Sequence, residues 1–177
     1  MSPTVELITD VLAFGTVVML AGAALLLLAL AFKDKSRAVR ARLAPFALPL
    51  AFIATLAGAA LTLVYSDIFG FVPCGLCWFQ RIFLYPMPIL LGIALWTRDQ
   101  GVTKYILGLG IPGALVALYQ HYLQMGGSSL VACPAVSDAA DCAQRIIFEY
   151  GFVTFPLMAF ALFLLAMLLA LVARSER

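Results

Sequence analysis

Residues 74–81 read Cys-Gly-Leu-Cys-Trp-Phe-Gln-Arg and stand between two apolar runs, with no charged residue between Asp67 and Arg81. Because an apolar run begins at Phe79, we expect a helix that starts just after Cys74 and holds Cys77 in its first turn. The free N–H groups and the positive dipole end of a helix N-terminus favour a thiolate, as does the Cys-x-x-Cys spacing. Arg81 lies four residues after Cys77 and therefore on the same helix face. The stretch predicts a redox-active dithiol beside a fixed cation.

The apolar runs around this stretch belong to a strongly hydrophobic chain. Of its 177 residues 64% are hydrophobic and 11% are charged, and the mean hydropathy is +1.07. A soluble domain is roughly half apolar, so membrane lipid is the expected surrounding of this chain. The net charge of +2, without a basic stripe, argues against a nucleic-acid partner.

Five apolar segments are each long enough to cross a bilayer as a helix, and none has a charge in its middle. They cover approximately residues 11–32, 43–65, 79–96, 105–122 and 152–173. Since lipid cannot satisfy the backbone of an open strand, the predicted fold is an all-α polytopic membrane helical bundle. Pro86 and Pro88 predict a kink or tilt in the third segment. No repeat or linker divides the chain, which we interpret as one integral membrane domain over residues 1–177.

Two features of these segments carry further expectations. Glu6 and Asp10 precede the first segment, no basic residue does, and its apolar run is too long for a signal peptide, so we expect a retained helix. Small residues four apart predict close helix packing at Ala54 and Gly58 and again at Gly108 and Pro112.

Basic residues predict the orientation. Nine of them fall on one side of an alternating five-helix path: Lys33, Lys35, Arg37, Arg40, Arg42, Arg98, Lys104, Arg174 and Arg177. Only Arg81 and Arg145 fall on the other side. The positive-inside rule places the nine, with the C-terminus, in the cytoplasm, and the N-terminus and both cysteine-bearing links outside. All four cysteines then face an oxidising compartment.

The second cysteine pair is Cys133 and Cys142, with eight residues between them. Gly126 and Gly127 make the entry to this link flexible. Pro134 keeps Cys133 out of helical geometry, so we expect Cys133 to be open to attack by the thiolate of another protein.

Three other uses of the cysteines were weighed. Structural disulfides are the usual use in secreted domains, but a five-helix bundle hardly needs them and a two-residue gap closes a very small loop. A zinc site fits poorly because the second pair is too widely spaced, and no metal is expected. Haem attachment is excluded because Trp78, not histidine, follows Cys77.

Two further polar residues have two interpretations each. His121, the single histidine, is either a helix-end residue satisfied by the dipole and headgroups or a hydrogen-bond partner of a bound cofactor. Arg81, at the start of a span, either extends its charge to the lipid phosphates or belongs to a site.

The run from Cys74 to Arg81, followed by Tyr119-Gln-His121, Cys133 and Cys142-Ala-Gln-Arg145, resembles the DsbB/BdbC family of quinone-coupled membrane disulfide-bond formation proteins. The resemblance covers about residues 43–173. It implies a four-helix core with a quinone at its outer edge and a DsbA-like client with a thioredoxin fold. The segment at about residues 11–32 would be one additional N-terminal transmembrane helix beside this core.

The resemblance also implies roles. Cys74 and Cys77 would pass electrons to the quinone, which is ubiquinone or menaquinone, with Cys77 nearest the ring. The residues expected to contact the quinone are Arg81, Gln80 and His121. Cys133 would form the mixed disulfide with the client, and Cys142 would resolve it and exchange with Cys74. The implied protein is a thiol:quinone oxidoreductase of the bacterial cytoplasmic (inner) membrane that supports extracytoplasmic disulfide formation.

Two departures from the family and two alternatives stay open. The first helix is additional, and is an assembly helix, a lipid-facing brace or an engineered addition. The loop between Cys133 and Cys142 is shorter than in the best-known enterobacterial members, a difference that bears on the identity of the client more than on the chemistry. The alternatives are a quinone oxidoreductase of the vitamin K epoxide reductase type, whose Cys-x-x-Cys would follow the loop pair, and a non-enzymatic scaffold with structural disulfides.

Overall fold

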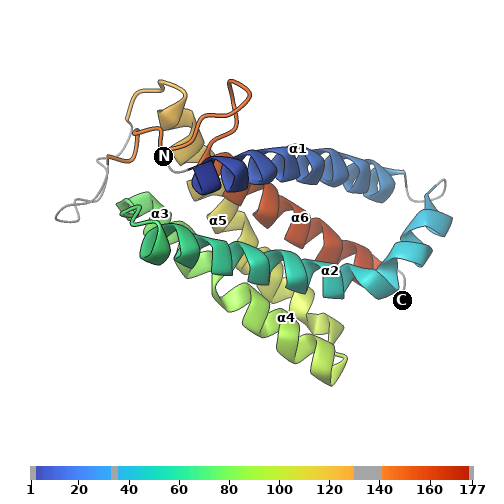
Figure 1. Ribbon diagram of the computed structural model, residues 1–177. Coiled ribbons are helices and arrows are strands. Elements are labelled where there is room, and N and C mark those ends of the chain that lie inside the picture. Colours follow the sequence, from blue (N-terminus) through green and yellow to red (C-terminus); the bar gives the residue numbers. More distant parts are fainter. Residues whose placement is uncertain (1–2, 33–35, 130–140, 176–177) are drawn as a thin grey trace.

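The structure is a computed structural model that describes residues 3–32, 36–129 and 141–175 (Figure 1). Its α-helices are α1 (Pro3–Ala31), α2 (Arg37–Leu63), α3 (Gly75–Leu84), α4 (Pro86–Thr97), α5 (Thr103–Gln124) and α6 (Phe155–Ser175). A π-helical turn, η1 (Val64–Ile68), extends α2, and a 3-10 turn, η2 (Gln100–Val102), precedes α5. Apart from one isolated bridge between Glu149 and Val153, the described residues form no strand pairing. The all-α prediction is confirmed.

Among the residues that the structure describes, five helical stretches are long and apolar enough to span a membrane, with α3 and α4 together forming the third. The break between α3 and α4 lies at Tyr85, directly before Pro86 and Pro88. Proline has no N–H to continue a helix, and its ring clashes with the preceding turn. The kink predicted from Pro86 and Pro88 therefore occurs at Tyr85, directly before the first of the two prolines.

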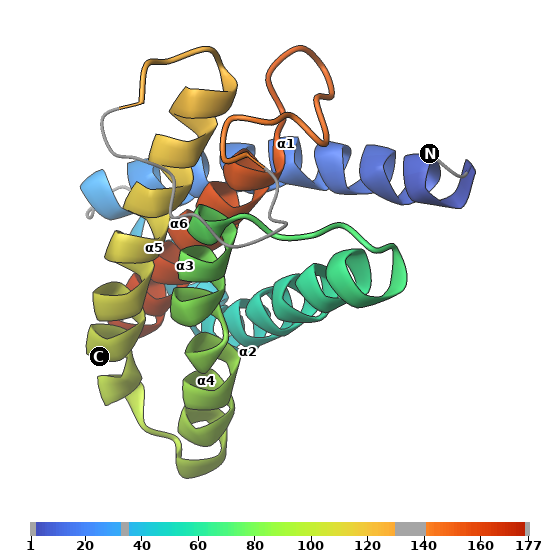
Figure 2. The ribbon, with the colours of Figure 1, turned by 90° about the vertical axis from the view of Figure 1, so that its left-hand side faces the viewer.

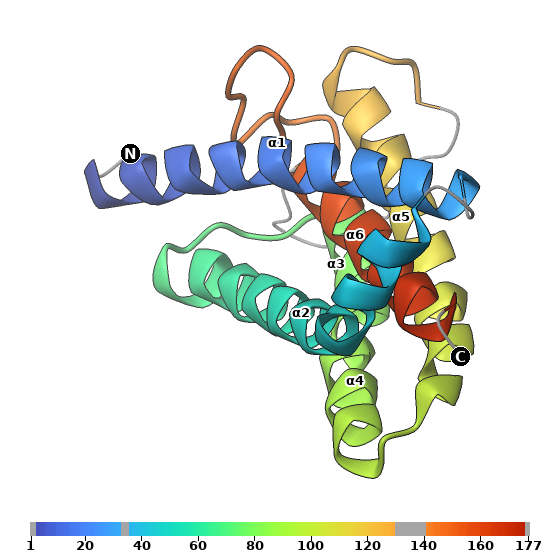
Figure 3. The ribbon, with the colours of Figure 1, turned by 90° about the vertical axis from the view of Figure 1, so that its right-hand side faces the viewer.

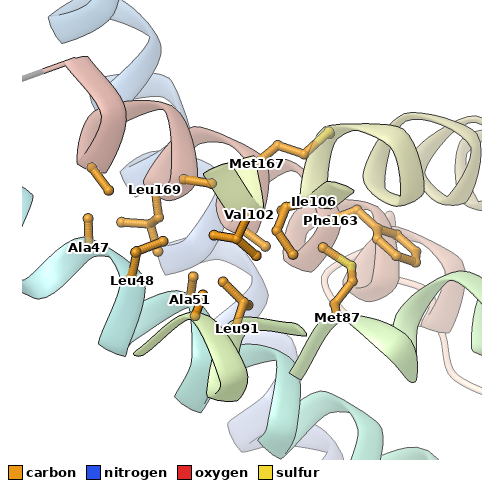
Figure 4. Packing of buried hydrophobic residues seen from close by; sticks show 14 of the residues in the cluster. Ala47, Leu48, Ala51, Met87, Leu91, Val102, Ile106, Phe163, Met167 and Leu169 are labelled. Carbon is orange, nitrogen blue, oxygen red and sulfur yellow. The ribbon is translucent and has the colours of Figure 1, made fainter. Parts of the chain in front are cut away.

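Helix α6 is the centre of the bundle, and α1, α2 and α5 pack around it (Figures 1 and 3). In the most apolar 18-residue stretch of α6, 61% is buried, against 17% in the corresponding stretch of α1. Figure 4 shows the shared core, in which Met87 and Leu91 of α4 meet Ile106 of α5 and Phe163 of α6. Lipid is as apolar as these side chains, so close packing rather than exclusion from water stabilises their association.

Glycines on α5 allow α5 and α6 to approach closely. A Cβ atom built on Gly113 would lie 2.6 Å from the ring of Phe163, and one on Gly110 would lie 2.5 Å from Cγ of Met167. On α2 the predicted seam at Gly58 is confirmed, because a Cβ there would meet Leu162. The prediction for Gly108 is wrong: a Cβ there meets nothing within 4 Å. Gly108 lies on the exposed side of α5, which the small-residue spacing alone did not reveal.

Replacing Gly113 by valine should destabilise the bundle, because overpacking a tight interface costs about 1–3 kcal/mol. The matched control is Gly108→Val, which makes the same change on the same helix in open space. We expect Gly113→Val to lower the melting temperature in detergent and Gly108→Val to leave it nearly unchanged. Equal shifts in the two variants would contradict the α5–α6 contact.

One end of the bundle, here called the cysteine end, gathers the start of α1, the turn η1, the start of α3, the end of α5 and the start of α6. In Figure 2, α3 runs beside α5, and residues 141–154 form loops above them. The C-terminal end of α6 lies at the opposite end (Figure 1). The Cys-x-x-Cys motif therefore meets residues from α5 and from the loop that follows it.

Candidate active site

Cys74 and Cys77 occupy the start of α3. Cys74 is the N-cap, in extended geometry (φ −72°, ψ 171°), and its Sγ accepts a hydrogen bond from the backbone N–H of Cys77 at 3.4 Å. Both cysteines are free, and their sulfur atoms lie 2.8 Å apart. The predicted placement at a helix N-terminus is what the structure has.

Gln120 of α5 connects the two sulfurs. Its Nε2 donates to Sγ of Cys74 at 3.1 Å and to Sγ of Cys77 at 3.3 Å, while its Oε1 accepts from Nε2 of Gln80. The side chain of Gln120 is only 1% exposed. No role for Gln120 was predicted from the sequence. The available signal was a polar side chain inside an apolar span, which by itself suggests a site.

The surroundings of Cys74 change the acidity of its thiol. The hydrogen bond with Cys77 and burial raise the pKa of the Cys74 thiol above its ordinary value. Cys74 therefore keeps its proton at neutral pH while the N–H groups at the start of α3 point toward the motif. The reduced pair is arranged as a thiol that donates to a neighbouring sulfur.

Arg81 lies one turn beyond Cys77 and is held in place. Its side chain is 8% exposed and donates to the carbonyl of Thr62 at 2.8 Å, and its guanidinium lies 5.1 Å from the ring centroid of Trp78. In the part of the chain that the structure describes, no carboxylate pairs with it. A buried cation without a counter-ion favours an electron-rich oxygen beside it.

An apolar cavity of about 360 Å³ lies next to this cluster. Its polar end is formed by Cys77, Gln80 and Arg81 of α3 and by Gln120 of α5. The remaining lining comes from α1, α2, η1 and α6 and from the connecting residues 71–73 and 146, and it consists mainly of aliphatic and aromatic side chains. The shape suits a ligand with one polar ring and an apolar extension.

Cys142 lies on the other side of Cys74. It is disulfide-bonded, 1% exposed, and packs in one cluster with Cys74 and Leu123. Two hydrogen bonds anchor its loop to the end of α5: Gln124 Nε2 donates to the carbonyl of Gln144 at 3.0 Å, and Arg145 Nε donates to the carbonyl of Gln124. Cys133 lies outside the described residues.

The structure thus brings together four of the residues singled out from the sequence, Cys74, Cys77, Gln80 and Arg81, and sets Cys142 against them. His121 is placed differently. Its Nδ1 is hydrogen-bonded to Oγ1 of Thr154 at 2.8 Å, and it does not line the cavity. A cofactor contact for His121 stays a prediction that this geometry does not support.

Replacing Gln120 by leucine should slow alkylation of the reduced Cys74/Cys77 pair by iodoacetamide about tenfold at neutral pH. A hydrogen bond to a charged group contributes about 1.5–3 kcal/mol, and Gln120 is the side-chain donor to both sulfurs. The control is Gln124→Leu, since Gln124 is equally polar, 6% exposed and bonded to the loop instead. If both variants react at the parent rate, Gln120 does not activate the pair.

The chain matches a known protein family. The profile of the family described as "Disulfide bond formation protein DsbB" matches residues 41–173. The matched range holds α3 to α6 and nearly all of α2, and it excludes α1. No solved structure matches the chain.

Curated relatives bear related names. The SPbeta prophage-derived disulfide bond formation protein B of Bacillus subtilis is 39% identical over 116 residues, which are 66% of this chain and 77% of that protein. Disulfide bond formation protein C of the same organism is 34% identical over 116 residues, covering 66% and 83%. The probable disulfide formation protein of Chlamydia trachomatis is 36% identical over 133 residues, covering 74% and 95%.

Proposed function

Because the chain belongs to the DsbB family of disulfide bond formation proteins, we propose that it is a thiol:quinone oxidoreductase that reoxidises a DsbA-like dithiol oxidase with a thioredoxin fold. The family and the five apolar helices make it a multi-pass membrane protein. One observation carries the proposal. The Cys74/Cys77 pair borders an apolar cavity through Cys77 and packs against the disulfide-bonded Cys142 through Cys74.

The first half of the reaction is thiol–disulfide exchange. The client dithiol loses two electrons and two protons as it becomes a disulfide, and the loop disulfide that includes Cys142 becomes two thiols. The thiolate of Cys142 then attacks Cys74 of an oxidised Cys74–Cys77 pair, and Cys77 leaves as a thiolate. Attack by Cys133 on Cys142 restores the loop disulfide and releases Cys74. After this step Cys74 and Cys77 are free thiols and Cys142 is disulfide-bonded. The structure has the same combination of free and bonded cysteines.

The second half reoxidises the pair. A quinone of the ubiquinone or menaquinone class supplies this chemistry when bound, because it accepts two electrons and two protons. The cavity fits such a group, since its polar end offers the donors of Arg81 and Gln80 beside the sulfur of Cys77. Arg81 would hold a ring oxygen, Gln120 would position the sulfurs, and Cys74 would retain its proton until the disulfide closes.

The membrane placement is part of the proposal. The nine basic residues on one side favour a cytoplasmic C-terminus, so the cysteine end faces the outside of the bacterial cytoplasmic (inner) membrane. A soluble client in that compartment reaches the loop without crossing lipid. Electrons then travel from the compartment into the bilayer, where the quinone resides.

A different observation argues against each of the two alternatives, the vitamin K epoxide reductase type protein and the scaffold. In a vitamin K epoxide reductase type protein the Cys-x-x-Cys would follow the loop pair, whereas here Cys74 and Cys77 precede Cys133 and Cys142. A scaffold with structural disulfides has no need of two free cysteines beside a cavity.

The test is quinone absorbance in detergent without oxygen, after a reduced DsbA-like protein is added to catalytic amounts of the chain. Loss of the oxidised quinone band over many turnovers, with disulfide formation in the client in equal amount, supports the proposal. The control omits the chain. If the folded chain reduces no quinone with any reduced client, the proposal is wrong and the scaffold is the interpretation that remains.

A further inference from the structure

Helix α1 lies wholly outside the family match, yet it forms part of the cavity. Leu12, Thr16 and Met19 of α1 line the cavity together with residues of α2 and α6. The sequence left the role of this helix open among an assembly helix, a brace and an addition. Its position beside the candidate site gives a more specific answer.

One stripe of α1 faces the bundle. Thr9, Ala13, Thr16 and Ala23 are almost completely buried and recur every three to seven residues, as expected for one helical face. The opposite face is open: Val18, for example, is 54% exposed. α1 packs mainly on α6 and touches α2 only slightly. In Figure 3, α1 and α2 lie apart on either side of α6.

The cavity lies in the space that these helices leave. Residues of α1, α2 and α6 line it, with Phe155 and Met158 among those of α6. The polar groups of Arg81 and Cys77 lie at its α3 end. A ligand whose ring lies at that end must extend its apolar part between α1 and α2.

We propose that α1 forms the wall that binds the isoprenoid tail of the quinone, with Thr16 and Met19 contacting the tail. This inference rests on the proposed function and adds a binding element that the family match does not include. Thr16 suits a hydrocarbon neighbour because its Oγ1 already donates to the carbonyl of Leu12 at 2.8 Å. Met19 adds a flexible thioether that adapts to irregular apolar shapes.

A polar contact fixes this wall at the cysteine end. Oγ1 of Thr9 and the hydroxyl of Tyr65 are 3.0 Å apart, and both residues are buried. Tyr65 lines the cavity and packs edge-on against Phe155, with ring centroids 4.8 Å apart. α1 is thereby tied to η1 at the cysteine end of the bundle.

The experiment compares two quinones with the same ring, one without a tail and one with two isoprene units. Dissociation constants come from quenching of tryptophan fluorescence in detergent, using Thr16→Phe in the full chain. The new ring would occupy the tail space, so we expect the tailed quinone to bind about tenfold more weakly, equivalent to about 1.4 kcal/mol. The tail-less quinone should bind within about twofold of the parent value, since its contacts lie at the α3 end.

Three variants make the result specific. Val18→Phe places the same side chain on the exposed face of α1 and should change neither constant. Leu25→Phe places it at a second exposed position of α1 and should also change neither. If Thr16→Phe does not fold, Met19→Ala is used, which widens the wall and should weaken binding of the tailed quinone alone.

The outcomes separate this inference from the proposed function. Equal effects on the two quinones, or no effect in Thr16→Phe and Met19→Ala, would overturn the tail-binding wall while a parent that reduces quinone keeps its function. A parent that binds neither quinone would overturn both.

Discussion

Replacing Cys77 by serine should abolish quinone reduction, with turnover falling by at least about a thousandfold, because no other group can take the place of a sulfur in a disulfide. Cys77 is the cysteine that lines the cavity, next to Gln80 and Arg81. Serine preserves the size of the side chain and the N-terminal turn of α3, so the fold should persist. The measurement is the anaerobic quinone assay with a reduced DsbA-like client.

The same variant makes a second, quantitative test possible. The loop disulfide that includes Cys142 is intact in it, so each chain should still oxidise at most one client molecule, without quinone. An unchanged melting temperature serves as the control for folding. Multiple turnover in Cys77→Ser would remove this cysteine from the electron path, and the absence of even one client disulfide per chain would favour a scaffold.

Cys74 and Cys77 have different neighbours, which would allow the short motif to exchange electrons on two sides under the proposed function. Cys74 is packed against Cys142, and Cys77 borders the cavity, although the two sulfurs are only 2.8 Å apart. A helix N-terminus allows this, because the N-cap and the third helical residue point their side chains back toward the same exposed amides. Gln120 bridges both sulfurs, so the pair is positioned from a second helix as well.

Much of this arrangement could be predicted from local sequence. Apolar segments of spanning length gave the helices, Pro86 and Pro88 gave the break between α3 and α4, and the apolar run after Cys77 gave its place in a helix. These features depend on neighbouring residues alone. The position of Arg81 on the face of Cys77 followed from the same helical spacing, and both residues line the cavity.

Other features depended on contacts between distant segments. Gln120 meets Cys74 and Cys77 only because α5 packs beside α3, and no spacing rule relates residues so far apart. Apolar residues surround helix α1 on every side, so its pattern did not indicate which face would meet α6. The partner of His121 is Thr154, a residue after the second cysteine loop, and the sequence could not place it.

Replacing Arg81 by alanine should raise the apparent KM for quinone by about ten- to a hundredfold, because a charge-assisted hydrogen bond contributes about 1.5–3 kcal/mol. Arg81→Lys keeps the charge but loses the planar fork that reaches Thr62 and lies over Trp78, so we expect a smaller increase. Oxidation of one client equivalent should stay at the parent rate in both variants, since the loop disulfide is separate from the cavity. The measurement is initial rate against quinone concentration.

Arg145→Ala is the matched control for Arg81→Ala. Arg145 is the other arginine on the side opposite the nine basic residues, it too lies over an aromatic ring, at 4.5 Å from the centroid of Phe148, and it does not line the cavity. If Arg81 merely anchored its helix to lipid phosphates, the two variants would affect quinone dependence alike. If only Arg81→Ala raises KM and the two variants melt at the same temperature, quinone binding depends on a cation at the polar end of the cavity. Arg81 is a cation at that place, and among the described residues no carboxylate pairs with it.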